Sequence, residues 1–227
     1  MSLSLVLPTY EEAESISRLL NHLLAIPEVD EILVVDDDSP DRTWEVAGTI
    51  QSPRLRVIRR VGERGLTSAL NRGIQEAKGE LVAWMDADGA MPADLIPSLL
   101  SAKQHADIAI GSRYVPGGRD RRPSSLRRFS SRLINRIARL VLGTTVRDCT
   151  TGFVLAERAW VLQNPLQGNY GDYCIRFLVH ADRSGLRVAE VPFENFERRM
   201  GRSKTKDSFL SFCRIGFGYL KAIWQLR

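Results

Sequence analysis

Short apolar runs alternate with helical segments through the first half of the chain, and this alternation constrains the fold most strongly. The strand-like runs are residues 3–7, 31–36, 55–58, 80–85 and 107–111, and the helical segments are 11–25, 41–50, 66–77 and 93–103. Strands and helices that alternate at this spacing predict a parallel sheet covered by helices on both faces. Right-handed crossovers make such a sheet Rossmann-like. We therefore predict an α/β fold whose ligands lie beyond the carboxyl ends of the strands.

The second half of the chain is less regular. Residues 113–125 contain Pro116, Gly117, Gly118, Pro123 and four arginines, and we expect a loop there. We predict helices at 124–142 and 172–183, strands at 151–155 and 187–192, and a basic loop at 194–206. Residues 207–227 are amphipathic at helical period. We expect one domain over residues 1–206, followed by a helix over 207–227 that lies at a membrane interface or packs on the core.

Several classes of protein are excluded by what the sequence lacks. No run of about 18 apolar residues occurs, so we expect no transmembrane helix. The first residues lack a basic leader, so we expect no signal peptide. Three scattered cysteines and three distant histidines indicate neither a disulfide framework nor a zinc site.

Carboxylates gather where two of the predicted strands end. Asp36, Asp37 and Asp38 follow one buried run, and Asp86 and Asp88 follow another. Like charges at adjacent strand ends lower stability unless a cation or hydrogen-bond donors compensate them. A helix cap accounts for one carboxylate of the triplet, and a polar turn is the simple alternative for the pair. Oxygen ligands of this kind suit Mg²⁺ or Mn²⁺, hard ions that bridge diphosphates.

These motifs resemble those of a known family. Pro8-Thr9-Tyr10-Glu11-Glu12, Asp36-Asp37-Asp38, Gly65-Leu66 and Asp86-Ala87-Asp88 stand in the order and spacing of family 2 glycosyltransferases, which have the GT-A fold. Gly111-Ser112-Arg113-Tyr114, Thr150-Thr151-Gly152-Phe153 and a late block from Arg198 to Lys204 are similar to the polyprenyl-phosphate branch, typified by dolichol-phosphate mannose synthase. The resemblance extends from residue 3 to about residue 206.

The resemblance implies roles for single residues on the donor side. In the family, the first block and the strand-end acids contact a nucleotide diphosphate sugar, and a late basic loop closes over its diphosphate. The implied donor-binding residues are Pro8, Tyr10, Glu12, Asp36, Asp38, Asp86, Arg198 and Lys204. Asp86 and Asp88 are the implied ligands of Mg²⁺ or Mn²⁺. Ala90 departs from the family pattern, because many relatives carry a glutamine ligand there, and Arg176 stands where an acidic residue is usual.

On the acceptor side, the resemblance implies that Arg113 meets the phosphate of a polyprenyl monophosphate. Arg127 and Ser131, four residues apart on the following helix, fit the family's spacing, although Arg128 also suits the register. With Asp88, these three are the expected catalytic residues. Arginine grips phosphate oxygens bidentately. The attacking phosphate oxygen is already ionised near neutral pH, so positioning and charge neutralisation suffice for an inverting transfer of a mannose-type or glucose-type sugar.

The charge distribution indicates where the chain meets its partners. The formal net charge is −8 over residues 1–112, +6 over 113–197 and +7 over 198–227. A basic helix and a basic, aromatic tail favour an anionic membrane surface, so we expect a cytoplasmic protein bound peripherally at the cytoplasmic face of the membrane. The resemblance leaves room for a membrane-embedded partner subunit. We expect no nucleic-acid partner, because few aromatic residues lie between the arginines.

Three other functions stay open at this point. A sugar nucleotidyltransferase also uses paired carboxylates, but residues 5–12 lack the glycine-rich phosphate loop expected of it. A drifted GT-A relative would have another acceptor or no activity. A non-enzymatic module that binds membranes or nucleic acid would show no metal-dependent nucleotide binding.

Overall fold

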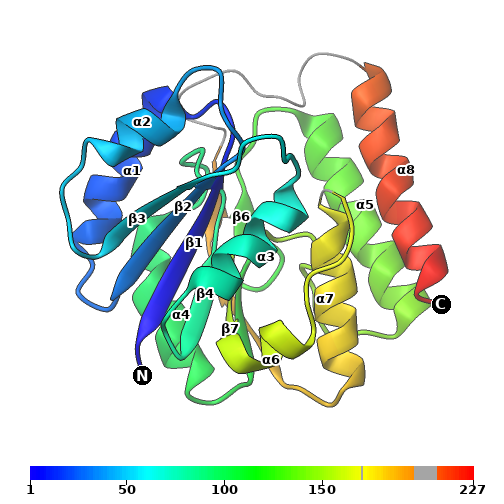
Figure 1. Cartoon of the computed structure of the whole chain (residues 1–227). Coiled ribbons are helices and arrows are strands. Elements are labelled where there is room, and N and C mark those ends of the chain that lie inside the picture. Colours follow the sequence, from blue (N-terminus) through cyan, green and yellow to red (C-terminus); the bar gives the residue numbers. More distant parts are fainter. Residues whose placement is uncertain (170, 197–208) are drawn as a thin grey trace.

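A seven-stranded sheet forms the centre of the computed structural model, which describes residues 1–169, 171–196 and 209–227 (Figure 1). Its strands are β1 (Leu3–Thr9), β2 (Glu31–Asp36), β3 (Leu55–Arg59), β4 (Leu81–Trp84), β5 (Ile108–Ser112), β7 (Val154–Glu157) and β8 (Val188–Pro192). They lie in the order β3-β2-β1-β4-β7-β5-β8. The predicted α/β, mostly parallel GT-A architecture is confirmed.

Strand β7 is the exception to the parallel arrangement. It runs antiparallel to both β4 and β5, with Val82 opposite Ala156 and Ile110 opposite Val154. The strand predicted at 151–155 begins later, at Val154, and its direction had not been predicted. Because of this antiparallel direction, the residues that precede β7 reach the same sheet edge as the carboxyl ends of the parallel strands.

Helices cover both faces of the sheet, because alternate side chains of each strand point to opposite sides. The helices are α1 (Ala13–Leu24), α2 (Thr43–Gly48), α3 (Leu66–Glu76), α4 (Ile96–Lys103), α5 (Ser125–Leu142), α6 (Arg158–Gln163), α7 (Asp172–Arg183) and α8 (Phe209–Gln225). Leu3, Leu5 and Leu7 of β1 pack in one core with α1, α2 and α4. Val6 packs in the other, to which α3, α5, α6, α7 and α8 contribute.

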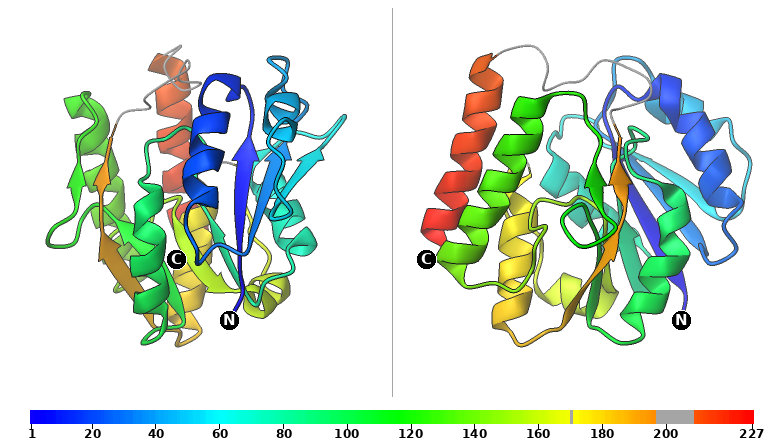
Figure 2. Two further views of the ribbon diagram at one scale, coloured as in Figure 1. Left: turned by 90° about the vertical axis from the view of Figure 1, so that its left-hand side faces the viewer. Right: turned by 180° about the vertical axis from the view of Figure 1, so that it is seen from behind.

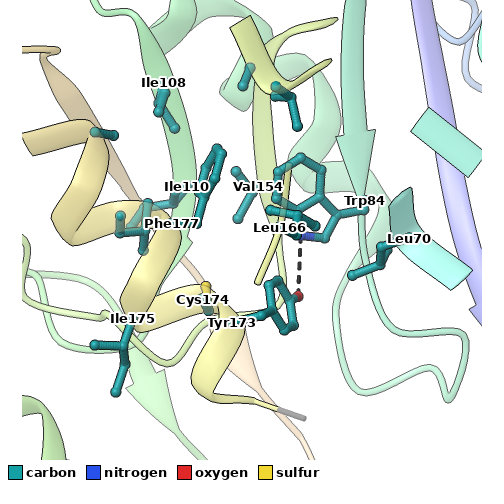
Figure 3. Packing of buried hydrophobic residues seen from close by; sticks show 14 of the residues in the cluster. Leu70, Trp84, Ile108, Ile110, Val154, Leu166, Tyr173, Cys174, Ile175 and Phe177 are labelled. Carbon is teal, nitrogen blue, oxygen red and sulfur yellow. Dashed lines mark hydrogen bonds between the residues drawn. The ribbon is translucent and has the colours of Figure 1, made fainter. Parts of the chain in front are cut away.

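An aromatic cluster anchors the end of β4 (Figure 3). Trp84 is 1% exposed and meets the ring of Phe177 edge-on, with centroids 5.4 Å apart. Its indole Nε1 donates to the hydroxyl of Tyr173 at 3.2 Å, so this buried N–H has a partner (Figure 3). An aromatic pair of this kind contributes about 0.5–1.5 kcal/mol beyond the area it buries. The cluster thereby holds the strand end that leads directly to Asp86.

Some elements differ from the sequence prediction. A small parallel pair, β6 (Arg119–Asp120) and β9 (Glu194–Asn195), lies within segments expected to be loops. The short helix α6 was not predicted. The helix predicted at 93–103 is divided into a 3₁₀ turn (Ala93–Leu95) and α4.

Helix α8 lies beside α5 and also packs against α7 (Figures 1 and 2). Ala222 and Ile223 are buried there, so this helix packs on the core. The expected domain boundary at residues 206 and 207 lies outside the described residues. Within the described part of the chain, no helix has the length and apolar character needed to cross a membrane.

Candidate active site

A cavity of about 960 Å³ opens at the carboxyl ends of the parallel strands. It brings together most of the residues that the sequence singled out, namely Pro8, Tyr10, Glu12, Asp86, Asp88, Arg113, Arg127 and Ser131. Asp36 and Asp38 do not belong to its lining. Arg198 and Lys204 lie outside the described residues. The cavity has an acidic wall at the ends of β1 and β4, and a basic wall built from the end of β5, the start of α5 and the segment before β7.

Asp86 and Asp88 form the centre of the acidic wall. The backbone N–H of Ala90 donates to Asp88 Oδ1 at 3.0 Å, which fixes one carboxylate against the turn that follows β4. Gly152 lies against the other: a Cβ at that position would stand 3.4 and 3.5 Å from the two carboxylate oxygens of Asp86. The absence of a side chain at Gly152 therefore keeps space for a ligand beside Asp86.

The triplet of residues 36–38 is used differently. Asp36 is fully buried and accepts hydrogen bonds from the Thr9 hydroxyl at 2.7 Å and from the Ser39 hydroxyl at 2.6 Å. Asp38 points elsewhere and pairs with Arg59 at 2.6 Å. These two carboxylates thus join β1, β2 and β3 at the rim of the sheet. Neither side chain belongs to the cavity lining. Direct contacts of Asp36 and Asp38 with base and ribose therefore stay a prediction.

Asp37 is the member of the triplet that lines the cavity, and sequence reasoning did not select it. Its carboxylate accepts from the Arg60 guanidinium, with Nε at 2.7 Å, and from the backbone N–H of Gly65 at 2.7 Å. Arg60 also donates to the Gly65 carbonyl. Asp37 and Arg60 therefore hold the turn before α3 in place.

That turn delivers Arg64 to the cavity. Its guanidinium carbon lies 3.9 Å from the centre of the Tyr10 ring, a cation–π stack on the acidic wall. Arg64 was missed by sequence reasoning, although it directly precedes the quoted Gly65-Leu66 motif. Its role depends on a contact with a residue 54 positions earlier, which the local pattern does not reveal.

Arg113 dominates the basic wall and is held by a buried partner. Its Nε donates to Asp148 Oδ2 at 2.8 Å, and its Nη2 donates to Asp148 Oδ1 at 2.7 Å and to the Thr150 hydroxyl at 2.9 Å. The Arg113 side chain is 7% exposed and that of Asp148 is fully buried. Burial alone would lower the pKa of the guanidinium, but the charge and hydrogen bonds of Asp148 raise that pKa above its usual value. Arg113 therefore stays charged, and its Nη1 is the part that these bonds leave for a ligand.

The start of α5 supplies the rest of the basic wall. Ser124 caps the helix by accepting from the Arg127 backbone N–H at 3.3 Å, and Gly143 ends it in the left-handed conformation at φ 68°. This register turns Arg127 and Ser131 toward the cavity. The Tyr114 hydroxyl donates to Ser131 Oγ at 2.8 Å, which orients the serine. Burial raises the pKa of Tyr114, so the phenol stays protonated as that donor.

Arg128, the alternative to Arg127, lies away from the cavity lining. Its guanidinium donates to the carbonyls of Pro123, at 3.0 Å, and Arg122. Arg122 lines the cavity and pairs with Asp120 at 2.6 Å, a contribution that the sequence did not single out.

Part of the cavity lining is apolar. Ile134 of α5 and Ile215 and Tyr219 of α8 line it. The Tyr219 hydroxyl occupies the space that a side chain at Gly171 would fill, so a glycine is needed where α8 meets the segment before α7. The tail helix therefore forms part of the site, which neither its amphipathicity nor its charge had indicated.

The structure also places Ala90 and Arg176, the two residues that depart from the family pattern. Ala90 lines the cavity, and its carbonyl accepts from the Phe196 N–H at 3.2 Å. Arg176 is outside the lining: it pairs with Asp172 of its own helix at 3.2 Å and ties α7 to α8 by donating to Gln225 at 2.5 Å. Arg176 thus has a structural role at the helix junction.

The donor set of the acidic wall fits a hard divalent cation. Among the described residues, no group of three or more His, Cys, Asp or Glu side chains is placed to hold a metal ion. Two carboxylates beside an open cavity, with space kept at Gly152, match an ion that takes its remaining ligands from a diphosphate and water.

The fold is that of nucleotide-sugar glycosyltransferases of the GT-A class. Mannosyl-3-phosphoglycerate synthase from Rubrobacter xylanophilus superposes with a TM-score of 0.74 at 19% identity, covering 100% of this chain and 74% of that one. Glucosyl-3-phosphoglycerate synthase from Mycobacterium tuberculosis, solved with Mn²⁺, UDP-glucose and phosphoglyceric acid, gives 0.76 at 19% identity, covering 99% and 79%.

The sequence comparisons narrow the class to a family. The profile described as glycosyl transferase family 2 matches residues 4–163, and the chain belongs to this family. It is 37% identical over 232 residues to dolichol-phosphate mannosyltransferase of Pyrococcus furiosus, covering all of this chain and 64% of that protein. It is 35% identical to undecaprenyl-phosphate mannosyltransferase of Micrococcus luteus, covering 88% of this chain and 85% of the relative. The chain thus spans somewhat less than two thirds of the archaeal relative's length.

Proposed function

We propose that the protein transfers a mannose-type or glucose-type sugar, with inversion, from a nucleotide diphosphate sugar to a polyprenyl monophosphate. The observation that carries this proposal is the pairing of an acidic and a basic wall across one cavity. Donor and acceptor are both anions, and their reacting ends approach each other only if their charges are offset. Relatives named for transfer to dolichol phosphate and undecaprenyl phosphate support the acceptor class.

The acidic wall is the proposed donor site. Asp86 and Asp88 would hold Mg²⁺ or Mn²⁺, which when bound offsets the charge of the donor diphosphate. Tyr10 with the Arg64 stack gives a flat, cationic surface at the other end of this wall, suited to the nucleotide. Pro8 and Glu12 complete the donor side of the lining.

The basic wall is the proposed acceptor site. Arg127 and the Nη1 of Arg113 are the proposed grips on the acceptor phosphate, and the Ser131 hydroxyl provides a third polar contact. No histidine occurs among the described residues that line the cavity. This suits a phosphate nucleophile, since its oxygen is already ionised and the chain needs only to position it behind the anomeric carbon.

The outer surface of α5 and α8 is the proposed attachment to the cytoplasmic face of the membrane. Leu126, Phe129, Leu133 and Leu140 recur along one side of α5 and are exposed, and we refer to them as the apolar crest. Phe217, Leu220 and Trp224 of the adjacent α8 are exposed as well, Trp224 by 73%. Apolar side chains flanked by arginines are typical of helices that lie on lipid. This favours a membrane over nucleic acid as the anionic partner, and a membrane-embedded partner subunit stays a prediction.

Turnover with defined substrates tests the proposal. The full chain is incubated with GDP-mannose or UDP-glucose, Mn²⁺ and a short-chain polyprenyl phosphate, and the glycolipid is detected by mass spectrometry. Product that depends on both metal and acceptor is expected. With pyrophosphate added in place of the acceptor, metal-dependent formation of the nucleoside triphosphate and the sugar 1-phosphate would indicate a nucleotidyltransferase instead. The thermal stability of the protein is measured in parallel with pairs of metal and nucleotide. If none of these pairs raises the unfolding temperature, the enzyme assignment is contradicted.

A further inference from the structure

A second hollow is lined by Tyr114 and Asn135, whose side chains also bond Ser131 and Thr150 of the cavity lining. It measures about 500 Å³. Its lining consists of Tyr114, Arg132, Asn135, Arg136, Arg139 and Arg147, and we call it the arginine hollow. Four exposed arginines therefore line an open surface hollow that belongs to no function described so far.

The four guanidinium groups of the arginine hollow lack the partners that most other described arginines have. None forms a hydrogen bond or ion pair with any described part of the chain. In the same basic half, Arg121 pairs with Glu194 at 3.0 Å and Arg122 with Asp120 at 2.6 Å. The unpaired arginines are thus not a general consequence of the basic composition.

The nearest acidic groups in sequence and structure are already used. Asp148 is committed to Arg113, and Glu190 accepts from the backbone N–H groups of Arg147, at 2.8 Å, and Asp148, at 3.0 Å. Clustered like charges destabilise a protein unless an anion offsets them. The hollow therefore has the charge and the donors for an anion that the described part of the chain does not provide.

The position of the hollow indicates where this anion comes from. Arg132, Arg136 and Arg139 recur at i, i+4 and i+7 on α5, directly beside the apolar crest on the same helix. A helix whose crest enters the apolar part of a bilayer holds its flanking arginines at the level of the headgroup phosphates. Figure 2 shows that α5 lies at the edge of the molecule beside α8, where such a surface is reachable.

We propose that the arginine hollow binds the phosphate of an anionic phospholipid headgroup, as a site distinct from the acceptor site. Planar arginine forks match phosphate oxygens in geometry as well as in charge. The inference rests on the proposed membrane attachment and not on the transfer reaction. Tyr114 separates the two sites while touching both, because its hydroxyl bonds Ser131 on the cavity side.

Vesicle binding by matched variants tests this proposal. The hollow variant R132Q/R136Q/R139Q is compared with R18Q/R72Q/K78Q, which removes the same charge from exposed positions on and beside α1 and α3. Each protein is titrated with phosphatidylcholine vesicles that contain phosphatidylglycerol, or a carboxylate lipid at the same surface potential. The wild type and the control variant should prefer the phosphatidylglycerol vesicles. The hollow variant should lose that preference and bind them at least about tenfold more weakly.

Three outcomes would overturn the proposal. The first is a hollow variant that keeps the preference for phosphatidylglycerol, and the second is a control variant that loses as much affinity. The third is that inorganic phosphate displaces the protein from the vesicles as effectively as soluble glycerophosphoglycerol does. The hollow would then bind free phosphate and not a lipid headgroup. Transfer to a short-chain acceptor in solution is measured in parallel and should be unchanged in the hollow variant. If the wild type does not catalyse this reaction, the proposed function is contradicted. The vesicle titration still tests whether the arginine hollow binds a lipid headgroup.

Discussion

The acidic and the basic wall of the cavity carry opposite charges but are built in the same way. On the acidic wall, Asp37 is tied to Arg60 and Gly65, whereas Asp86 and Asp88 border open space. On the basic wall, Arg113 is tied to Asp148, whereas Arg127 reaches the lining from the first turn of α5. In each wall, a buried ion pair supports the backbone and the groups beside it face the ligand space.

This comparison shows that a run of like charges in a sequence does not identify ligands one by one. Asp36 and Asp88 are both carboxylates at the end of a buried strand, β2 and β4 respectively. Asp36 is nevertheless fully used by Thr9 and Ser39. Charged residues that hold the walls should affect stability, and those that face the cavity should affect substrate use. Substitutions at the two kinds of residue should therefore separate the effect on stability from the effect on substrate use.

The largest expected effect is on stability, at the support of the basic wall. Asp148→Ala leaves the buried Arg113 guanidinium without its counter-charge, which should destabilise the fold by about 3–5 kcal/mol. Chemical denaturation monitored by circular dichroism measures this change. The double variant Asp148→Ala/Arg113→Met should recover part of the loss, since it removes the unpaired charge. A loss below about 1 kcal/mol would show that the pair does not support the wall.

On the acidic wall, Asp88→Asn should act on catalysis and leave the fold intact. The amide oxygen still accepts from the Ala90 N–H, but the carboxylate charge is gone. We expect transfer to fall by about a hundredfold to a thousandfold, with loss of metal-dependent nucleotide binding. Asp94→Asn, at an exposed carboxylate paired with His22, is the matched control and should be near neutral. Full activity of Asp88→Asn with Mg²⁺ and Mn²⁺ would refute the donor assignment.

Arg127→Ala should separate the basic wall from the acidic one. Loss of a charged grip on the acceptor phosphate should raise the acceptor KM or lower kcat by about tenfold to a hundredfold, with donor affinity unchanged. Steady-state kinetics with varied acceptor, together with nucleotide titration, gives both quantities. Arg128→Ala is the control, because that guanidinium bonds backbone carbonyls. Larger acceptor defects in Arg128→Ala than in Arg127→Ala would reverse the register assigned here.

The smallest expected effect concerns pH. Burial would raise the pKa of Asp120, but the hydrogen bond and charge of Arg122 lower it below its usual value near 3.8. The stabilisation by Asp120 is therefore complete above that unfolded value and is lost as pH falls through the lower folded value. Asp120→Asn should reduce the loss of stability on acidification below about pH 4, which thermal unfolding at several pH values measures. An unchanged acid dependence would count against this pair.

Much of the fold was predictable, because hydrophobic periodicity reports which face of each element is buried. Residues 172–183 were expected to be helical and form α7, and the predicted 124–142 segment forms α5 after its Ser124 cap. The direction of β7 was not predictable, since an apolar run looks the same in either orientation. The two-residue strands β6 and β9 depend on each other across more than 70 residues.

The site was predictable where a motif places its residues directly at a strand end, as for Asp86 and Asp88. It was not predictable where a distant partner decides the role of a side chain. Arg64 reaches the cavity because Asp37 and Arg60 hold its turn, and Tyr219 does so because Gly171 makes room for it. No local pattern contains either relation.

The central claim, two walls for two anions, is tested most directly by calorimetric titration of GDP and UDP with Mn²⁺ into three proteins. These are the wild type, Asp88→Asn and Arg127→Ala. The account predicts metal-dependent binding to the wild type, the same affinity for Arg127→Ala within about threefold, and loss of the metal-dependent part in Asp88→Asn. Equal weakening in both variants, or binding to Asp88→Asn that still depends on metal, would contradict it.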